Sequence, residues 1–116
     1  MGIVSDALPR VATAFGGGMS RQGNVCGAVT GGLMAVGLSR GRRAKTDSRE
    51  SAYAAGAEIQ KRFLAAFGTL NCRDLTGCDL STLKGQELFK AKNQDCVCCL
   101  YLELVARSVV ELVGPA

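Results

Sequence analysis

Apolar residues recur at helical spacing along most of this chain, and glycine-rich or polar stretches separate the periodic segments. The longest such segment begins at Asp47 or Ser48 and ends near Phe67, where Gly68 stops it. Similar patterns predict helices over residues 5–15, 24–38 and 81–90, and from residue 93 or 95 to 113. No segment alternates with a period of two for long enough to predict a strand. The predicted fold class is therefore all-α, a small bundle of four to five helices.

Local signals set the expected ends of these helices. Asn24 is expected to cap the second helix, because asparagine is a preferred N-cap residue. Residues 70–83 are expected to form a turn-rich connection that carries Cys72 and Cys78. Gly85 weakens the fourth predicted helix, which is why the bundle is given as four to five helices.

The composition predicts a core of small side chains. The chain has 116 residues, of which 47% are hydrophobic and 5% aromatic, so it is expected to form one domain over residues 1–116. A narrow face of the second predicted helix would let another helix or a ligand approach its backbone closely. That face consists of Gly27, Ala28, Gly31, Gly32 and Ala35.

Charge and hydropathy exclude several kinds of partner. The formal net charge is +4, and the densest basic stretch consists of Arg40, Arg42, Arg43 and Lys45. No aromatic residue is interleaved to stack on bases, so the stretch is interpreted as a solvated loop and no nucleic-acid partner is expected. Residues 1–10 lack a secretory pattern, and the apolar stretch over 25–38 is shorter than the roughly 20 residues that span a bilayer. We therefore expect a cytoplasmic protein with no membrane partner.

Thiol chemistry is the strongest chemical signal in the chain. It has six cysteines and no histidine. In a reducing compartment such cysteines favour metal binding, catalysis or redox cycling over a structural disulfide framework. The missing histidine excludes Cys₂His₂ zinc sites, histidine-ligated haem and Cys–His catalysis by this chain alone. No nucleophile–base pair is visible either, so hydrolase chemistry is not expected.

A glycine-rich run over residues 16–32 surrounds the first cysteine, Cys26. The run does not match a phosphate-binding loop, because Asn24 and Val25 stand where such a loop has Lys followed by Ser or Thr. Cys26 lies at the predicted start of a helix, where the partial positive charge of the helix N-terminus favours a thiolate. The alternative is an inert cysteine that packs in the core as a small hydrophobe.

The other cysteines allow a metal site. Cys96 and Cys99 are three positions apart and would share a face of the last helix, as a metal-binding pair or a dithiol. Together with Cys72 and Cys78 they would supply four thiolates, enough for zinc or an iron–sulfur cluster. The spacing of Cys72 and Cys78 is loose for such a site, so metal binding is the alternative hypothesis.

Two blocks of the sequence carry a resemblance to a known family. Residues 23–31 read Gly-Asn-Val-Cys-Gly-Ala-Val-Thr-Gly, and residues 67–80 contain Cys72-Arg73-Asp74-Leu75. Together they resemble the C_GCAxxG_C_C family of bacterial redox-active proteins, over nearly the whole chain. The resemblance implies an all-helical fold and redox-active cysteines.

This resemblance also implies which cysteines matter. The cysteine of the family's Cys-Gly-Ala-x-x-Gly motif is Cys26, and that of its Cys-Arg-x-Leu motif is Cys72. The third family cysteine opens the last helix. Cys98 fits it best, because Tyr101 and Val105 then fall on the family's apolar positions, and Cys96 and Cys99 remain open as alternatives. Family members usually carry a further cysteine on an upstream helix, for which this chain begins too late, so a missing N-terminal helix is expected.

We expect Cys26, Cys72 and Cys98 to converge near the start of the second helix. Cys26 would be the attacking thiolate and Cys72 or Cys98 the resolving thiol, with a redox partner protein that the sequence does not identify. Two other classes stay open. One is a metal or iron–sulfur module, and the other is a structural subunit whose apolar groove a second copy fills in a homodimer.

Overall fold

The computed structural model describes residues 5–114, which form helices and loops and contain no β-strand. The elements follow in the order α1 (Ala7–Ala12), the 3-10 turn η1 (Thr13–Phe15), α2 (Gly27–Arg40), α3 (Glu50–Phe67), α4 (Cys72–Thr76), α5 (Leu83–Lys92) and α6 (Cys98–Val113). The predicted all-α class is confirmed. In this described part of the chain, no helix has the length and apolarity needed to cross a membrane.

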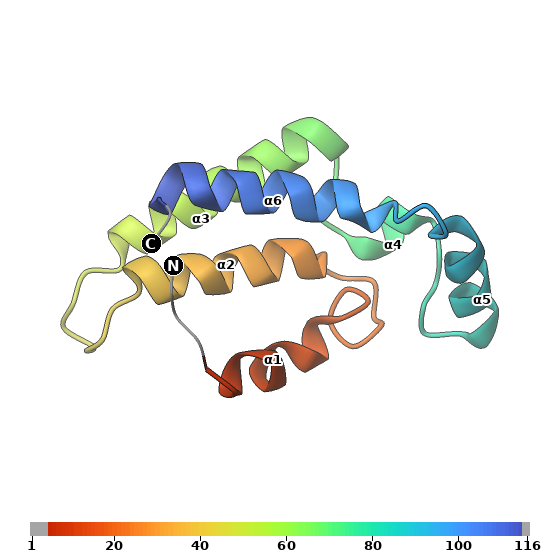
Figure 1. The fold of residues 1–116 in the computed structure, drawn as a ribbon, viewed down its shortest axis with the longest axis horizontal. Helices are drawn as coiled ribbons and strands as arrows, with labels where there is room; N and C mark the ends of the chain where they lie inside the picture. The colour runs from red at the N-terminus through yellow and green to blue at the C-terminus, as the bar shows by residue number, and fades with distance from the viewer. Residues whose placement is uncertain (1–4, 115–116) are drawn as a thin grey trace.

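The core lies between α2, α3 and α6, which contact one another pairwise (Figure 1). α3 runs in the opposite direction to the other two helices. Val29 of α2 and Ile59 and Phe63 of α3 are completely buried. A Cβ added at Gly32 would collide with Val105 of α6, whereas one added at Gly31 would meet nothing within 4 Å. Along the small-residue face of α2, α6 therefore comes close to the backbone at Gly32 and not at Gly31.

The second helix begins later than predicted. Asn24 does not cap it, because its N–H donates to the Gly18 carbonyl at 2.8 Å and its carbonyl accepts from the Cys72 N–H at 2.7 Å. These long-range hydrogen bonds hold Asn24 in the preceding loop. Cys26 takes the N-cap position of α2 instead, with an extended ψ of 134°.

Residues 70–83 contain a helix that the turn-rich prediction missed. The short helix α4 begins after Asn71, whose backbone is extended and forms an isolated antiparallel bridge with Val25. Gly77 ends the helix in the left-handed conformation, with a φ of 68°. A five-residue helix carries too little periodicity to be visible in the sequence, and its start is determined by the bridge.

The last helix also begins later than predicted. Asn93 ends α5, and its side-chain oxygen accepts a hydrogen bond from the Cys98 N–H at 3.2 Å. Cys96 has a φ of 53°, a left-handed value that an α-helix does not contain. α6 therefore starts at Cys98, and Cys96 lies in the turn before it.

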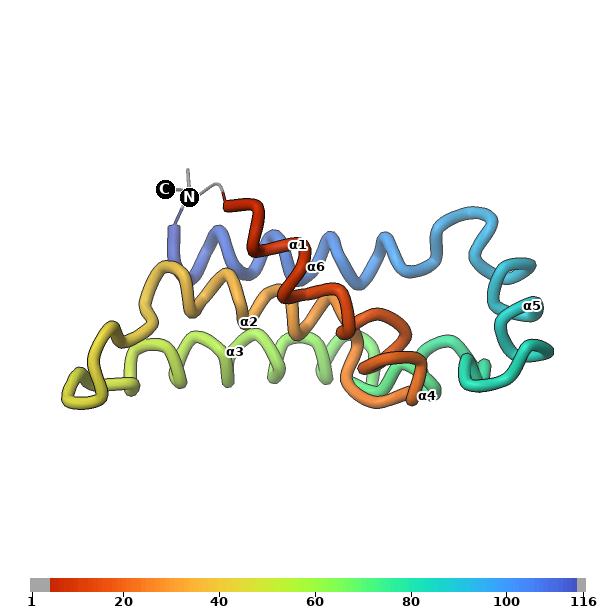
Figure 2. Tube along the Cα trace, turned by 90° about the horizontal axis from the view of Figure 1, so that it is seen from below, coloured from red at the N-terminus to blue at the C-terminus, as the bar shows by residue number. Residues whose placement is uncertain are grey.

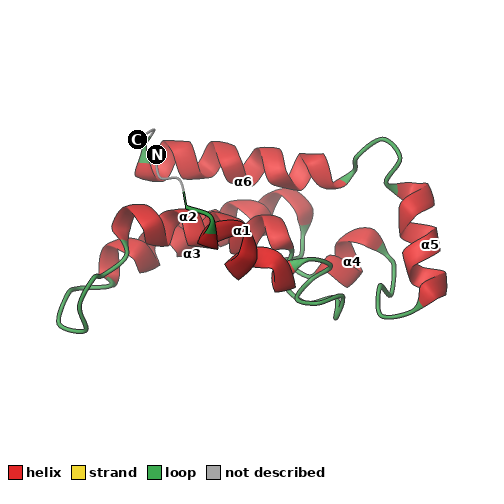
Figure 3. Ribbon diagram, turned by 60° about the horizontal axis from the view of Figure 1, so that its bottom comes forward, coloured by secondary structure: helices red, strands yellow, loops and turns green. Residues whose placement is uncertain are grey.

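Several chain segments meet at one end of the bundle. The starts of α2 and α6 lie there together with α4, and α5 stands across the bundle axis (Figure 2). The loops that lead into α2 and α4 meet at the same end (Figure 3). The exposed basic loop between α2 and α3 lies at the opposite end. Chemistry-bearing residues from distant parts of the sequence are therefore brought to one place.

Candidate functional site

The loop before Cys26 has an unusual backbone. The five residues from Gly17 to Arg21 all have positive φ values, between 54° and 71°. Three of them are not glycine, and each such left-handed residue costs roughly 1–2 kcal/mol. Hydrogen bonds hold the turn closed, including Arg21 N–H to the Gly16 carbonyl at 3.0 Å and Gly23 N–H to the Gly17 carbonyl at 3.2 Å. Strained backbone of this kind is concentrated at functional sites.

This loop is joined to the segment that carries Cys72. The Cys26 N–H donates to the Leu70 carbonyl at 2.8 Å, and the Cys72 N–H donates to the Asn24 carbonyl at 2.7 Å. Val25 and Asn71 form the antiparallel bridge between these two bonds. As a result, Cys26 and Cys72 lie on neighbouring backbone segments, Cys26 just before α2 and Cys72 at the start of α4.

Gly18 makes this close approach possible. A Cβ at Gly18 would lie 2.6 Å from the Cβ of Cys72 and 2.7 Å from the backbone of Asn24, far inside normal contact. Gly18 also has a φ of 71°, which favours glycine for a second reason. The glycine-rich run is therefore needed to seat Cys72 beside the loop.

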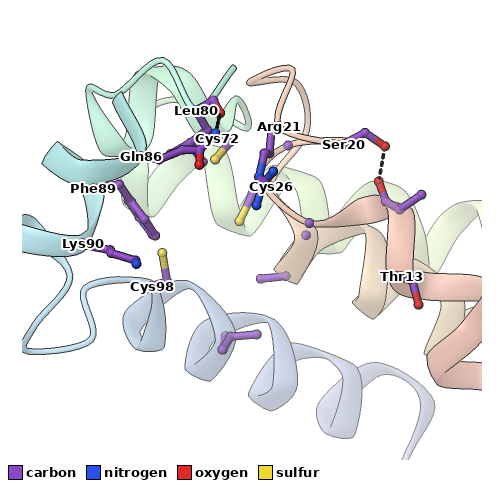
Figure 4. A pocket seen from close by; sticks show the side chains of 17 residues that line it. Thr13, Ser20, Arg21, Cys26, Cys72, Leu80, Gln86, Phe89, Lys90 and Cys98 are labelled. Atoms are coloured by element: carbon purple, nitrogen blue, oxygen red, sulfur yellow. Dashed lines mark hydrogen bonds between the residues drawn. The ribbon is translucent and has the colours of Figure 1, made fainter. Parts of the chain in front are cut away.

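A cavity of about 850 Å³ opens between the loop, α2, α4, α5 and α6. Cys26, Cys72 and Cys98 all line it, and Figure 4 shows their sulfur atoms pointing toward a common space. Cys26 and Cys72 are buried, at 8% and 9% exposure, whereas Cys98 is half-buried on the first turn of α6. All three are free thiols.

The cavity changes the ionisation of Cys72 and Cys98. Burial raises the pKa of Cys72, and the charges of Cys26 and Cys98 raise it further, whereas a hydrogen bond with Thr76 lowers it. The pKa of Cys98 is raised by burial and then by the charge of Cys26. Burial also raises the pKa of the nearby Tyr101 hydroxyl, with smaller contributions from the same thiols. A second negative charge in the cavity is therefore disfavoured once one thiol has ionised.

Stability is expected to fall as the pH rises through the alkaline range. In the unfolded chain the thiols ionise near pH 8.5, and in the folded protein the pKa of Cys72 and Cys98 is raised. Above about pH 8.5 the unfolded state releases protons that the folded state still holds. The stability that these two protonated thiols contribute is therefore fully present below this pH and is lost as the pH rises through their folded pKa. Urea midpoints between about pH 7 and 10 measure this loss. A variant with Cys72→Ala and Cys98→Ala should show a flatter profile, and an unchanged slope would contradict the assignment.

The remaining cysteines do not line this cavity. Cys78 is 2% exposed and packs with Cys72 and Leu80 in a small separate cluster, where its thiol donates to the Thr76 carbonyl at 3.4 Å. Cys96 and Cys99 are joined in a disulfide with a Cα–Cα distance of 5.3 Å. Because Cys96 precedes the helix, they meet through the turn and not on a shared helix face.

The four thiols considered as a zinc or iron–sulfur set are therefore divided between two places. Cys72 and Cys78 lie in the small cluster, and Cys96 and Cys99 have bonded to each other. Over residues 5–114, no group of three or more Cys, Asp or Glu side chains is arranged to hold a metal ion.

The cavity also holds residues that the sequence did not single out. Arg21 of the left-handed loop lines it, as do Gln86, Phe89 and Lys90 of α5. The position of Arg21 inside the glycine-rich run was the only local signal for any of them. α5 is placed over the cavity by tertiary packing, which helical periodicity does not describe.

The sequence and the geometry agree with one family assignment. The family model described as "Putative redox-active protein (C_GCAxxG_C_C)" matches residues 1–112. No curated protein and no solved structure matches the chain. The match covers the loop and all three cavity cysteines, and the chain belongs to the C_GCAxxG_C_C family.

Proposed function

We propose that this protein carries out thiol–disulfide exchange in the cavity, with Cys26 as the attacking thiolate and Cys72 as the resolving thiol. The observation that supports the proposal is that three free thiols, from the N-cap of α2 and from the first turns of α4 and α6, line one cavity. The three thiols interact electrostatically, since the charge of Cys26 raises the pKa of both Cys72 and Cys98. Such coupling is typical of thiols that act together.

The attacking role goes to Cys26 because of its place on the helix. Cys26 is the N-cap of the 14-residue helix α2, whose N-terminus carries partial positive charge and favours an adjacent thiolate. Cys72 and Cys98 are held as thiols by burial, which raises the pKa of each. The raised pKa keeps Cys72 and Cys98 as thiols at neutral pH, which leaves the first attack to Cys26.

The resolving role goes to Cys72 because its backbone is paired with the segment that carries Cys26. Two neighbouring charges raise the pKa of Cys72, and the charge of Cys26 contributes more than the charge of Cys98. This order agrees with the pairing of the two backbone segments. In the reaction, the Cys26 thiolate attacks one sulfur of a disulfide, its S–S bond breaks, and one thiolate leaves. The Cys72 sulfur then attacks Cys26, its proton goes to the second leaving thiolate, and a Cys26–Cys72 disulfide remains. Two electrons have passed from the protein to the substrate.

Alkylation of the folded protein tests the attacking role. We expect iodoacetamide to label Cys26 at pH 7 well above the rate of a free thiol, and to label Cys72, Cys98 and Cys78 more slowly. Peptide mass spectrometry of the labelled protein measures each rate separately. After one equivalent of a disulfide oxidant, the same mapping should find Cys26 joined to Cys72. Slow, uniform labelling of all free cysteines would overturn the proposal, and a Cys26–Cys98 bond would move the resolving role to Cys98.

A further inference from the structure

The cavity that holds the three thiols is positively charged. Arg21 and Lys90 line it, and no Asp or Glu is among its lining residues. In Figure 4 Arg21 extends along the Cys26 side of the cavity, and Lys90 lies on the Cys98 side. The N-terminus of α2 opens onto the same space, since Gly27 and Ala28 also line it, and adds partial positive charge.

The two side chains have no acidic partner in the described part of the chain. The ion pairs found there join Arg62 to Glu58 and Glu111, Arg73 to Asp79, and Arg107 to Glu103. Arg21 and Lys90 belong to none of them. Their charge is therefore available to a molecule in the cavity.

The backbone around Arg21 is arranged so as to bring this residue to the cavity. Arg21 has a φ of 67°, an unfavourable value for a non-glycine residue. Its Cα would lie 2.9 Å from a Cβ at Gly17, so the glycine is needed for the turn to close on it. The left-handed loop thus places Arg21 at the edge of the cavity, where its side chain also stays exposed to solvent.

We propose that the substrate of this cavity is a small disulfide that carries negative charge, such as one bearing carboxylates at both ends. The inference rests on the proposed exchange at Cys26 and names its substrate class. Arg21 and Lys90 would bind the two anionic ends, which sets the S–S bond over the Cys26 sulfur. The apolar side chains of Leu80, Phe89 and Leu102 supply contacts for the middle of the molecule. A cavity of about 850 Å³ is the size of a small-molecule site.

With an anionic disulfide as substrate, atoms and electrons balance as in the general exchange reaction. The Cys26 thiolate attacks one sulfur of the anionic disulfide, whose other half leaves as a thiolate. The Cys72 sulfur then displaces the second half, which takes the Cys72 proton. The substrate therefore leaves the cavity as one thiolate and one thiol, and the protein is left with one new disulfide.

Disulfide probes of different charge test the inference. The probes are 5,5′-dithiobis(2-nitrobenzoate), a dianion, 4,4′-dithiodipyridine, neutral at pH 7, and cystamine, a dication. The rate constant of each at Cys26 is divided by its rate constant with 2-mercaptoethanol, which removes the intrinsic reactivity of the probe. We expect the normalised rate for the dianion to exceed that for the neutral probe by about tenfold at low salt. Cystamine should be slowest, and added salt should remove the preference.

Two double variants of the full chain assign the preference to these side chains. Arg21→Gln with Lys90→Gln should abolish most of it. The control, Arg42→Gln with Lys84→Gln, removes the same two residue types outside the cavity, with Lys84 on the same helix as Lys90, and should retain it. A preference close to one in the wild type, or the same loss in both double variants, would overturn the inference.

A pair of alkylating reagents separates this inference from the proposed function. Iodoacetate and iodoacetamide differ by one negative charge and need no disulfide chemistry. If Cys26 reacts faster with iodoacetate after normalisation while no probe disulfide is exchanged, the cavity is anion-selective but the proposed exchange is wrong. If the disulfides react without any charge preference, the exchange holds and the anionic substrate class falls.

Discussion

Replacing Cys26 with serine should lower the rate of thiol–disulfide exchange with a probe disulfide by at least about a hundredfold. Serine has nearly the same volume, so the fold and the backbone hydrogen bond to Leu70 should be retained. The hydroxyl is a far weaker nucleophile than a thiolate at neutral pH, which is why the loss is large. Stopped-flow measurement with 4,4′-dithiodipyridine, with far-UV circular dichroism as a check of the fold, gives the rate.

Two other cysteine variants serve as comparisons for the Cys26→Ser variant. Cys78→Ala removes a buried thiol that does not line the cavity, so it should lower the free energy of unfolding but leave the exchange rate within about twofold. Cys72→Ser should allow the first attack and then stall at a mixed disulfide on Cys26, which mass spectrometry detects. A Cys26→Ser variant that exchanges at the wild-type rate would show that another cysteine makes the attack.

Replacing Gly18 with alanine should lower the free energy of unfolding by about 2–5 kcal/mol. Part of the loss comes from the left-handed backbone, since Gly18 has a φ of 71° and an alanine there costs roughly 1–2 kcal/mol. The rest comes from the added Cβ, which would lie 2.6 Å from the Cβ of Cys72 and force the two segments apart. Urea unfolding of the reduced protein measures the total, and the labelling rate of Cys72 should change with it.

Gly68 offers a matched control for the backbone contribution. It has a φ of 80°, and a Cβ there would meet nothing within 4 Å. Gly68→Ala should therefore cost only the roughly 1–2 kcal/mol of the left-handed conformation. If Gly18→Ala and Gly68→Ala destabilise the protein equally, the close contact with Cys72 carries no energy, and the role given to the glycine-rich loop is wrong.

The predicted helices differ in how well they were placed, and the difference has a physical cause. α3 is long, and its end at Phe67 followed by Gly68 was predicted correctly because both signals are local in the chain. The N-cap of α2 was misplaced by two residues, at Asn24 instead of Cys26, because Asn24 is hydrogen-bonded to Cys72 and not to its own helix. α4 was missed for the same reason, since the bridge between Val25 and Asn71 determines where it begins.

The candidate site was predictable only as a set of cysteines. The resemblance to the family singled out Cys26, Cys72 and Cys98, and all three line the cavity. The charge of the cavity was not predictable, because Arg21 and Lys90 lie far apart in the chain. The pairing of Cys96 with Cys99 was expected only as one use of a shared helix face, and it forms through a turn instead.

The sequence by itself determined the helical class and the long helices of the core, and it singled out cysteine as the candidate chemistry. These follow from periodicity, from glycine stops and from residue types, all of which act over a few neighbouring positions. The tertiary structure alone decided that Gly18 would seat Cys72, that Cys26 would cap α2, and that two cations would face the thiols. Each of these depends on contacts between segments that are distant in the chain, and such contacts form only when the backbone of one segment fits that of another.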